Sequence, residues 1–553
     1  MAAALFCLLT LSSAPATAKI VSNASRHPSF AADLIVGQPL DGFVSYSIEF
    51  SSFPDFAGNA STPNKFSNNL LDNIGYLTGT KPYIRVGGNT QDYAIYNPNL
   101  TIALNGTINA TRSPDYPTTI EIGPSYFESY STWPNVKFSH GFNMGGNNDS
   151  RQWPTLLQTA ALACKALGTD KLYWWEYGNE PDLFATSAQG PVRPSNYNES
   201  DYVAEWLAGT RAIRGVLAET CPDLLSNETY GYIAPSFAGV ANHLKAPLTW
   251  ADGLDADGTI RYFSTHNYIS GATSPGVTLQ GTLMNHTRTK SSVDTHVSEF
   301  AEIASAATPG LVQILGETNS LYNQGKPGLS NSFGAALWAI DFSLYSASVG
   351  IGRVHMHMGT NYRYASWQPI TTDLGVAGTR APYYGNIAVA AFLGNLRIEP
   401  VRIAHLDLAA QEEQATNGTE TDVGVRDSAY AAYVDDVLAR IIVINMRAYN
   451  YTLNGTGDLD ALNPAPRKVR TYNFGVDGFE DGREAVVRRL FANGSDAITG
   501  ISWDGVSYNY ELALGKPVRL ANVTTGEKVE VKGGAVEVAV PDSQAVVLDF
   551  GAV

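Results

Sequence analysis

Residues 172–181 read LYWWEYGNEP, and residues 311–317 read LVQILGE. Both stretches begin as short apolar runs rich in strand-forming side chains. Both end at or beside a glutamate, Glu180 in the first and Glu317 in the second. In a barrel of parallel strands, polar residues at the carboxyl ends of the strands share one rim. The two stretches therefore favour a barrel that brings Glu180 and Glu317 to the same rim.

The same pattern extends from residue 42 to residue 395, where short apolar strands alternate with amphipathic helical stretches as in βα units. Strands are predicted over residues 42–50, 82–87, 136–144, 172–178, 230–236, 261–267, 311–316 and 352–358, and helices over 154–168, 200–219, 331–349 and 385–395. This α/β pattern predicts a (β/α)8 TIM barrel over residues 42–395. A doubly wound sheet is the structural alternative, but the sequence contains no GxGxxG or Walker loop to mark its nucleotide site.

The character of the chain changes after about residue 396. Valine alternates with polar residues on both sides of the Gly533-Gly534 turn, at Val529, Val531, Val536, Val538 and Val540. This is the pattern of a hairpin with one buried face. Residues 440–446 (RIIVINM) and 543–550 are further strand candidates. We predict a C-terminal β-sandwich domain over residues 396–553, which the N-terminal segment 19–41 could join.

Composition and charge limit the function. The chain has 553 residues, of which 44% are hydrophobic, so two domains with sizeable cores are expected. It has 36 basic and 52 acidic residues, a formal net charge of −16. That balance disfavours nucleic acid as a partner, and also a polysulfated polymer held by broad basic patches.

The first 18 residues predict a secreted protein. An apolar run from Ala2 to Leu11 is followed by small residues and the cleavage pattern Ala16-Thr17-Ala18, as in a signal peptide. The run is shorter than the roughly 20 residues that cross a bilayer, so no membrane partner is expected. Asn-x-Ser/Thr sequons, which predict a glycoprotein, occur at Asn23, Asn59, Asn99, Asn105, Asn109, Asn148, Asn198, Asn227, Asn285, Asn417, Asn450, Asn454, Asn493 and Asn522.

The cysteines leave one question open. Cys7 lies in the predicted signal peptide, so Cys164 and Cys221 remain as a pair that could form one disulfide or stay free. The sequence has no CxxC motif or Cys/His cluster, so no metal site is predicted.

The long segment 97–135 between the second and third predicted strands also has two interpretations. It carries closely spaced sequons and several prolines. It could be a glycosylated surface excursion or the wall of a pocket.

Two glutamates at the fourth and seventh strand ends suit glycosidic cleavage. That reaction needs one carboxylic acid to protonate the leaving oxygen and a second, ionised carboxylate to attack the anomeric carbon or activate water. Two acids in one pocket raise each other's pKa, which keeps one protonated. Either Glu180 or Glu317 alone could equally be a helix cap or a surface charge. Glu176 is expected to point away from the site and to serve structure.

Three segments together resemble glycoside hydrolase family 79, of the fungal secreted β-glucuronidase type: WWEYGNEP at 174–181, ILGETNSLYNQG at 314–325 and RVGGNTQD at 85–92. The family includes β-glucuronidases and heparanase-like enzymes. The resemblance covers the whole barrel, while the β-rich tail matches only in type. It implies a retaining mechanism without a cofactor, with Glu180 as acid/base and Glu317 as nucleophile.

The resemblance also suggests residues that bind the sugar. Asn179 would bind the 2-hydroxyl, and Tyr268, in the stretch 265–268, would hold Glu317 ionised. For His266 and Tyr268 the alternative is packing at the barrel rim. The substrate carboxylate would be bound by the loop that contains Tyr322, Gly325 and Lys326, with Tyr364 as a further candidate. The alternative for Tyr364 is aromatic packing under the β-sandwich.

Four further residues lie at the first two strands. Glu49, Asn89 and Asp92 could bind the remaining hydroxyls, and Arg85 could pair with the catalytic carboxylates. Alternatively, the four form a polar cluster whose hydrogen bonds are satisfied internally. The function most favoured is an exo-β-glucuronidase acting on a carbohydrate that contains glucuronic acid or 4-O-methylglucuronic acid. An endo-acting enzyme on a glycosaminoglycan and a barrel that binds carbohydrate without cleaving it are the alternatives.

Overall fold

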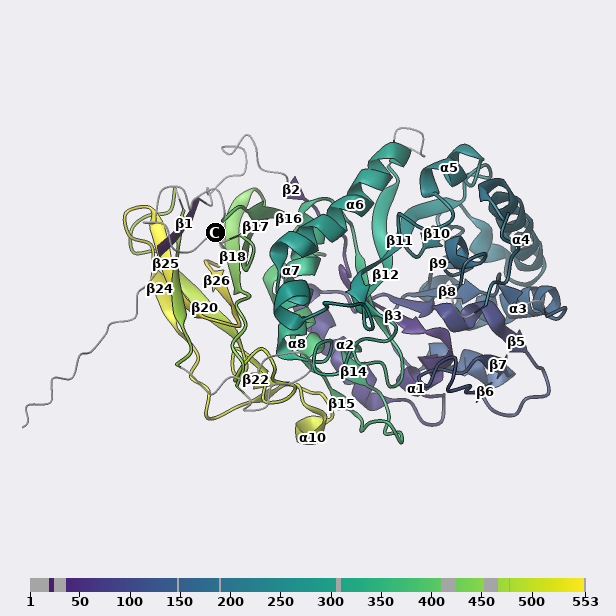
Figure 1. The fold of residues 1–553 in the computed structure, drawn as a ribbon, viewed down its shortest axis with the longest axis horizontal. Coiled ribbons are helices and arrows are strands. Elements are labelled where there is room, and N and C mark those ends of the chain that lie inside the picture. The colour runs from purple at the N-terminus through teal and green to yellow at the C-terminus, as the bar shows by residue number, and fades with distance from the viewer. Residues whose placement is uncertain are drawn as a thin grey trace, which may run out of the picture.

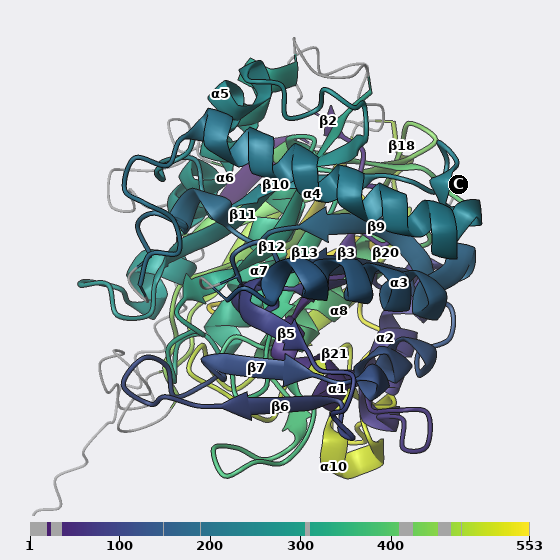
Figure 2. The same ribbon diagram turned by 90° about the vertical axis from the view of Figure 1, so that its right-hand side faces the viewer.

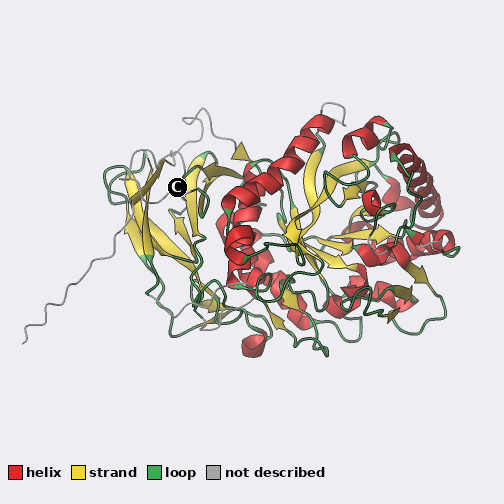
Figure 3. Ribbon diagram, in the orientation of Figure 1, coloured by secondary structure: helices red, strands yellow, loops and turns green. Residues whose placement is uncertain are grey.

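The computed structural model describes residues 19–23, 36–146, 149–187, 190–304, 310–408, 424–451, 466–476 and 478–551. The predicted signal peptide, residues 1–18, lies outside this part of the chain. Eight parallel strands close into a barrel, which confirms the predicted (β/α)8 fold. Figure 1 and Figure 3 show the barrel strands with helices packed around them. In barrel order the strands are β3 (Val44–Glu49), β4 (Ile84–Gly87), β8 (Phe138–Phe142), β9 (Leu172–Tyr177), β10 (Tyr232–Phe237), β11 (Ile260–Gly271), β12 (Val312–Tyr322) and β13 (Val354–Met358).

Helices surround these strands. They are α1 (Phe53–Ala57), α2 (Lys65–Thr78), α3 (Gln152–Lys171), α4 (Glu199–Thr220), α5 (Ala246–Ala251), α6 (His286–Ala304), α7 (Phe333–Ser348) and α8 (Ala381–Leu393). Local sequence fixes where some of them begin. Asn198 and Asp201 form a reciprocal capping box at the start of α4, and Asn64 caps α2 by accepting a hydrogen bond from the Ser67 amide.

Helix α7 differs from an ordinary surface helix because all of its 16 residues are buried. It lies with α8 between the barrel strands and the C-terminal sheets, as Figure 1 shows. A helix that is apolar on every side must be covered on every side. The barrel therefore needs a second layer of protein over α7 and α8.

That layer is the predicted β-sandwich, which is confirmed. Its larger sheet contains, in order, β2 (Val36–Gly37), β16 (Val401–Leu406), β17 (Asp427–Val434), β18 (Val437–Asn445), β26 (Gln544–Asp549), β20 (Glu484–Phe491), β21 (Ser502–Trp503), β22 (Val506–Ser507) and β23 (Val518–Arg519), with β24 (Lys528–Glu530) paired to β20. The smaller sheet consists of β1 (Lys19–Asn23), β19 (Val469–Gly475) and β25 (Ala535–Pro541). The N-terminal segment therefore contributes one strand to each sheet.

The central strands of the larger sheet are buried on both faces. Tyr430 and Ala432 of β17 belong to the core shared with the barrel, whereas Ala429 and Ala431 belong to the core between the two sheets. Successive side chains of a strand point to opposite faces. Burial on both sides explains why the segment 440–446 is almost continuously apolar instead of alternating.

The long segment between β4 and β8 has regular structure. Its strands β5 (Ala94–Tyr96), β7 (Thr119–Ile122) and β6 (Leu104–Thr107) form a small sheet, seen beside the barrel in Figure 2. The short helix η4 (Pro124–Ser131) follows, with Tyr126 and Tyr130 fully buried. The segment is therefore part of the packed structure.

The sequons fall into distinct environments. Asn59, Asn99, Asn105, Asn109, Asn198, Asn227, Asn493 and Asn522 are exposed, and Asn285 is half-buried. Asn450 is only 4% exposed and accepts a hydrogen bond from Ser495 Oγ at 3.2 Å, so it does not fit the prediction of an accessible sequon. The side chains of Asn23, Asn148, Asn417 and Asn454 lie outside the described part of the structure. Among the described residues, no helix is both long and apolar enough to cross a membrane.

The two remaining cysteines form a disulfide. Cys164 lies in α3 and Cys221 directly after α4, with their Cα atoms 6.2 Å apart. The bond therefore ties neighbouring helices on the outside of the barrel.

The double variant Cys164→Ala/Cys221→Ala should lose about 2–4 kcal/mol of unfolding free energy, because the bond closes a long loop in the unfolded chain. The two cysteines are 57 residues apart in sequence. Urea denaturation of the wild type, with and without reductant, measures the loss. Reductant should lower the wild-type midpoint and leave that of the variant unchanged. Equal midpoints for wild type and variant would contradict the prediction.

Candidate active site

Arg85 lies at the centre of a polar network inside the barrel. It is fully buried in β4. Its Nη1 donates to Glu317 at 2.6 Å, its Nε to Glu176 at 2.8 Å, and its Nη2 to Asn179 at 2.8 Å. Burial alone would lower the pKa of Arg85, but Glu176 and Glu317 outweigh it and raise the pKa. One fixed positive charge thus connects residues from the second, fourth and seventh barrel strands.

Glu176 belongs to this network, contrary to the expectation that it points away from the site. It is fully buried, and its carboxylate accepts hydrogen bonds from Arg85 and, at 2.6 Å, from Ser236 Oγ. Glu176 lies in β9, which ends at Tyr177, and Glu180 follows three residues after the end of that strand. The role of Glu176 is structural, but it lies directly beside the site.

Glu317 has an environment that favours its ionised form. Tyr268 donates its hydroxyl to Glu317 Oε1 at 2.7 Å, and Arg85 donates to Oε2. His357 Nδ1 lies 3.5 Å from the same Oε2. Burial by itself would raise the pKa of Glu317, but His357, His266, Arg85 and the hydrogen bond from Tyr268 together lower it. The group is a carboxylate at any ordinary working pH.

His357 is a residue that sequence reasoning missed. It lies in β13 with its Nε2 3.5 Å from Glu49 and its Nδ1 2.8 Å from Ser47 Oγ. Burial would lower its pKa, but the charges of Glu317 and Glu49 and a hydrogen bond to Glu49 raise it. The signal was present in the strand, since VHMHM places two histidines on one face of an otherwise apolar segment.

Glu180 has the opposite environment. Burial is the largest cause that raises its pKa, and the negative charge of Glu317 adds to it. Its carboxyl Oε1 lies 2.9 Å from Nδ1 of His266, whose pKa burial lowers to about 4. His266 is therefore neutral at mildly acidic pH and suits a protonated carboxyl partner. Glu180 also has a positive φ of 51°, a strained conformation for a residue with a side chain, and its amide donates to Ser236 O at 2.9 Å.

The two glutamates face each other closely. Glu180, His266 and Glu317 each offer one polar atom, and these atoms all lie within 4.8 Å of one another. Three such ligands could in principle hold a metal ion, but both oxygens of Glu317 already accept hydrogen bonds and two cationic side chains adjoin them. The arrangement suits a pair of carboxyl groups with different protonation states on one reacting centre.

The other polar residues at the first strands are largely engaged with the protein itself. Asp92 accepts from the amides of Met144 and Gly145 and from that of Asn179 at 2.8 Å, so it ties strand ends together and does not fit the expected sugar ligand. Glu49 accepts from Thr90 at 2.6 Å. The side chains of Asn179 and Asn89 are joined at 3.2 Å, with Asn179 next to Glu180.

The loop after β12 is held by its own hydrogen bonds. The Gly325 amide donates to Leu321 O at 3.1 Å, and the Lys326 amide donates to Ser330 Oγ at 3.0 Å. These two amides therefore do not fit the expected role of binding a substrate carboxylate. Gly325 has a φ of +78°, and a Cβ there would lie 2.9 Å from the Tyr364 amide, so glycine permits this close approach.

The two tyrosines predicted to bind the substrate carboxylate, Tyr322 and Tyr364, lie in different environments. Tyr322, the last residue of β12, is 45% exposed, and its hydroxyl lies 3.3 Å from Ser274 Oγ. Tyr364 is buried beside the site, with its ring 6.1 Å from those of Tyr268 and His357. It packs at the site and not under the β-sandwich.

Arg363 links the long segment between β4 and β8 to this loop. It forms a paired contact with Asp115, at 2.5 Å and 2.8 Å, and donates to Gly325 O at 3.2 Å. Its backbone amide donates to Gln324 O at 2.8 Å. The segment 97–135 therefore contacts the part of the rim that carries Tyr364, as expected for a pocket wall.

Comparisons with known proteins agree with this geometry. Residues 429–547 match the family model described as the glycosyl hydrolase family 79 C-terminal beta domain. A β-glucuronidase of Neurospora crassa is 61% identical over 503 residues, which cover 89% of this chain and 88% of that protein. A β-glucuronidase of Aspergillus niger is 54% identical over 515 residues, covering 92% of this chain and 91% of that protein.

Solved structures show the same fold. A 4-O-α-L-rhamnosyl-β-D-glucuronidase from Fusarium oxysporum has a TM-score of 0.73 at 24% identity, with 96% of this chain and 100% of that chain covered. A family 51 α-L-arabinofuranosidase from Bifidobacterium longum has a TM-score of 0.57 at 12% identity, covering 98% and 100%. On the strength of the two fungal relatives and the matched C-terminal domain, the chain belongs to glycoside hydrolase family 79.

Proposed function

We propose that the protein is a retaining exo-β-glucuronidase that removes terminal β-linked glucuronic acid or 4-O-methylglucuronic acid from a glycan. The observation that carries this proposal is the pair Glu180 and Glu317, whose oxygens lie within 4.8 Å and whose pKa values are shifted in opposite directions. The names of the two fungal relatives support the glucuronide as substrate.

In the proposed mechanism, protonated Glu180 gives its proton to the glycosidic oxygen as Glu317 attacks the anomeric carbon. The aglycone leaves as an alcohol, and the sugar becomes an ester of Glu317. Formation of the ester removes the negative charge that helps to raise the pKa of Glu180. Glu180, now a carboxylate, takes a proton from water, which attacks the anomeric carbon and releases the sugar.

The spacing of the two carboxyl groups favours retention. Retaining glycosidases hold these groups about 5 Å apart, whereas inverting enzymes leave about 6.5–9.5 Å for a water molecule. Oxygens within 4.8 Å fit the retaining distance. Arg85 and Tyr268 would hold Glu317 in place throughout, since both donate to its oxygens.

Two features support an exo-acting enzyme. The Asp115–Arg363 contact fastens the segment 97–135 against the rim near Tyr364, which would close one end of the site. The net charge of −16 also opposes a polyanionic chain lying across the enzyme. We further propose that the protein is secreted and glycosylated, on the basis of residues 1–18, the exposed sequons and the disulfide.

Replacement of either glutamate should separate the two roles. Glu317→Ala should lower kcat on an aryl β-glucuronide by about 10⁴-fold or more, because no covalent intermediate can form. Glu180→Ala should lower kcat/KM by about 10²–10⁴-fold for a poor leaving group and much less for a dinitrophenolate, which needs no proton to depart. Azide should rescue Glu180→Ala and give the β-glucuronyl azide, identified by NMR. Circular dichroism checks folding, and wild-type rates from Glu317→Ala would remove that residue from the mechanism.

The pH profile of kcat/KM should be bell-shaped. Activity rises with pH as Glu317 loses its proton at low pH, and falls as Glu180 loses its proton above the ordinary range of a carboxyl group. Tyr268→Phe should move the acidic limb to higher pH, because the lost hydrogen bond favours the ionised form of Glu317. Glu180→Gln, assayed with an activated aryl glucuronide, should lose the basic limb. A basic limb that persists in Glu180→Gln would assign it to another group.

A panel of aryl β-glycosides tests the substrate. The glucuronide and 4-O-methylglucuronide should be hydrolysed and the glucoside and galactoside left intact, while a glucuronylated glycan should release only monosaccharide. Tyr364→Phe should raise KM for the glucuronide about tenfold or more, as expected for a lost hydrogen bond to a charged group. Tyr322→Phe is the matched control and should leave KM unchanged. Hydrolysis of the neutral sugars alone would overturn the substrate assignment, and oligosaccharide products would overturn the exo mode.

A further inference from the structure

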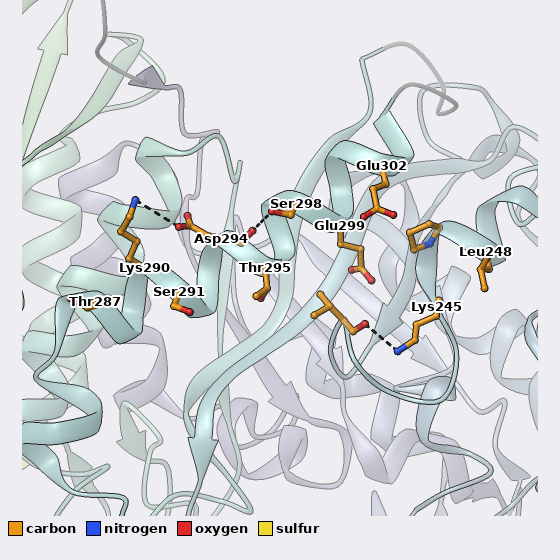
Figure 4. A pocket seen from close by; sticks show the side chains of 12 residues that line it. Lys245, Leu248, Thr287, Lys290, Ser291, Asp294, Thr295, Ser298, Glu299 and Glu302 are labelled. Atoms are coloured by element: carbon orange, nitrogen blue, oxygen red, sulfur yellow. Dashed lines mark hydrogen bonds and ion pairs between the residues drawn. The ribbon is translucent and has the colours of Figure 1, made fainter.

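A cavity lies on the flank of the barrel, between α6 and the segment that joins β10 to α5. Its volume is about 780 Å³, within the usual size range of ligand pockets. Figure 4 shows α6 along one side, with Ser291, Thr295 and Ser298 among the residues that line the cavity, and Lys245 on the opposite side. Nothing in the proposed catalytic mechanism uses these residues.

The buried carboxyl group of Glu299 is the feature of this cavity that points to a ligand. The residue is only 7% exposed, and its Oε2 is buried without a hydrogen-bond partner. In Figure 4 its carboxyl group points from α6 toward the space in front of Lys245. A buried polar atom without a partner is costly, so a ligand that donates a hydrogen bond here would relieve that cost.

Lys245 supplies a donor on the opposite wall. Its ammonium group donates to Asn242 O at 2.7 Å and to Val240 O at 3.4 Å. An ammonium group has three hydrogens, so one more can be donated into the cavity. The hydroxyls of Thr295 and Ser298 donate to backbone carbonyls of α6, which leaves their oxygens as acceptors for a ligand.

The lining does not favour charged ligands. Lys290 is paired with Asp294 at 3.7 Å on α6 itself, and Glu302 balances Lys245, so no net positive charge attracts an anion such as a glucuronate. A cation is disfavoured because burial, with Asp182 and Glu302, raises the pKa of Glu299 to about 7, so that the carboxyl is neutral in mildly acidic solution. A neutral carboxyl both donates and accepts hydrogen bonds, which suits a hydroxyl group.

The wall of this cavity continues to the candidate active site. Asp182, two residues after Glu180, accepts from the Ala238 amide at 2.9 Å and from Asn242 Nδ2 at 2.8 Å. The segment that carries Lys245 is therefore anchored beside Glu180.

We propose that this cavity, bounded by Glu299 and Lys245, is a second binding site for a neutral, hydroxyl-bearing saccharide. Donor and acceptor groups stand on opposite walls, and Pro247 and Leu248 give an apolar surface for the C–H face of a sugar ring. This inference rests on the proposed function, because the saccharide is taken to be the neutral part of a glycan whose terminal glucuronate occupies the catalytic site.

Direct binding tests the site. Neutral galactose-, xylose- and glucose-based oligosaccharides of three to six units are titrated into the full-length enzyme by calorimetry and saturation-transfer NMR. Glucuronic acid in excess keeps the catalytic site filled. At least one neutral series should bind. Glu299→Ala and Lys245→Met should weaken its Kd about tenfold or more, while Glu299→Gln, which keeps a hydrogen-bonding group, should retain most of the affinity. Glu219→Ala, an exposed glutamate on α4, is the matched control and should bind like the wild type.

Kinetics distinguish the source of the saccharide. If the ligand is the chain of the substrate itself, Glu299→Ala should lower kcat/KM on a glucuronylated glycan about tenfold and leave an aryl glucuronide unchanged. If the ligand is a separate glycan, Glu299→Ala should lose oligosaccharide binding, while its kcat/KM values on the glucuronylated glycan and on the aryl glucuronide both stay at the wild-type level. If the enzyme hydrolyses aryl glucuronides but binds no neutral oligosaccharide, the second binding site is overturned and the proposed function is not. Tighter binding of uronate oligomers or polyamines, or undiminished binding by Glu299→Ala, would also overturn it.

Discussion

The ion pairs of Arg85 organise the interior of this barrel. A guanidinium group that is fully removed from water must be paired, and here it is shared between Glu317 and Glu176. The same group donates to Asn179, the residue before Glu180. One buried charge therefore sets where the side chains of three strands stand. Loss of that charge would leave Glu176 and Glu317 buried without their arginine counter-charge, which costs more than the net contribution of the intact network.

The environments of the two glutamates explain how one residue type can take two opposite roles. Glu317 lies among Arg85, His357 and the Tyr268 hydroxyl, all of which favour the carboxylate. Glu180 lies beside a neutral histidine, and its own burial, together with the charge of Glu317, favours the acid. The cationic groups are thus placed on one side of the pair. That asymmetry, more than the presence of two acids, makes a proton available on one side and an electron pair on the other.

The parts of the molecule that follow from local pattern could be predicted from the sequence. The sequence predicts all eight barrel strands and the approach of Glu180 to Glu317, because apolar runs that end in polar residues reflect burial and strand direction directly. Partners that are distant in sequence could not be found that way. Asp92 was expected to bind sugar but is used by three backbone amides, and Glu176 was expected to point away but neutralises Arg85. The strand VHMHM shows that His357 is unusual, but not what it does, because its partners Glu49 and Glu317 are each contributed by another strand.

The β-sandwich bears on the candidate active site although its strands lie outside the barrel. Helix α7 follows β12, the strand that carries Glu317, and is buried on every side. Tyr430 of the larger sheet donates its hydroxyl to Asp341 of α7 at 2.7 Å, and Asp341 is also 2.9 Å from His286 Nδ1 at the start of α6. Without the sheet, α7 would expose an apolar face and a charged group that needs these partners. The helices behind β11 and β12 are therefore held in place by the sandwich. Because those two strands place the Tyr268 hydroxyl 2.7 Å from Glu317, the second domain stabilises the geometry of the proposed nucleophile.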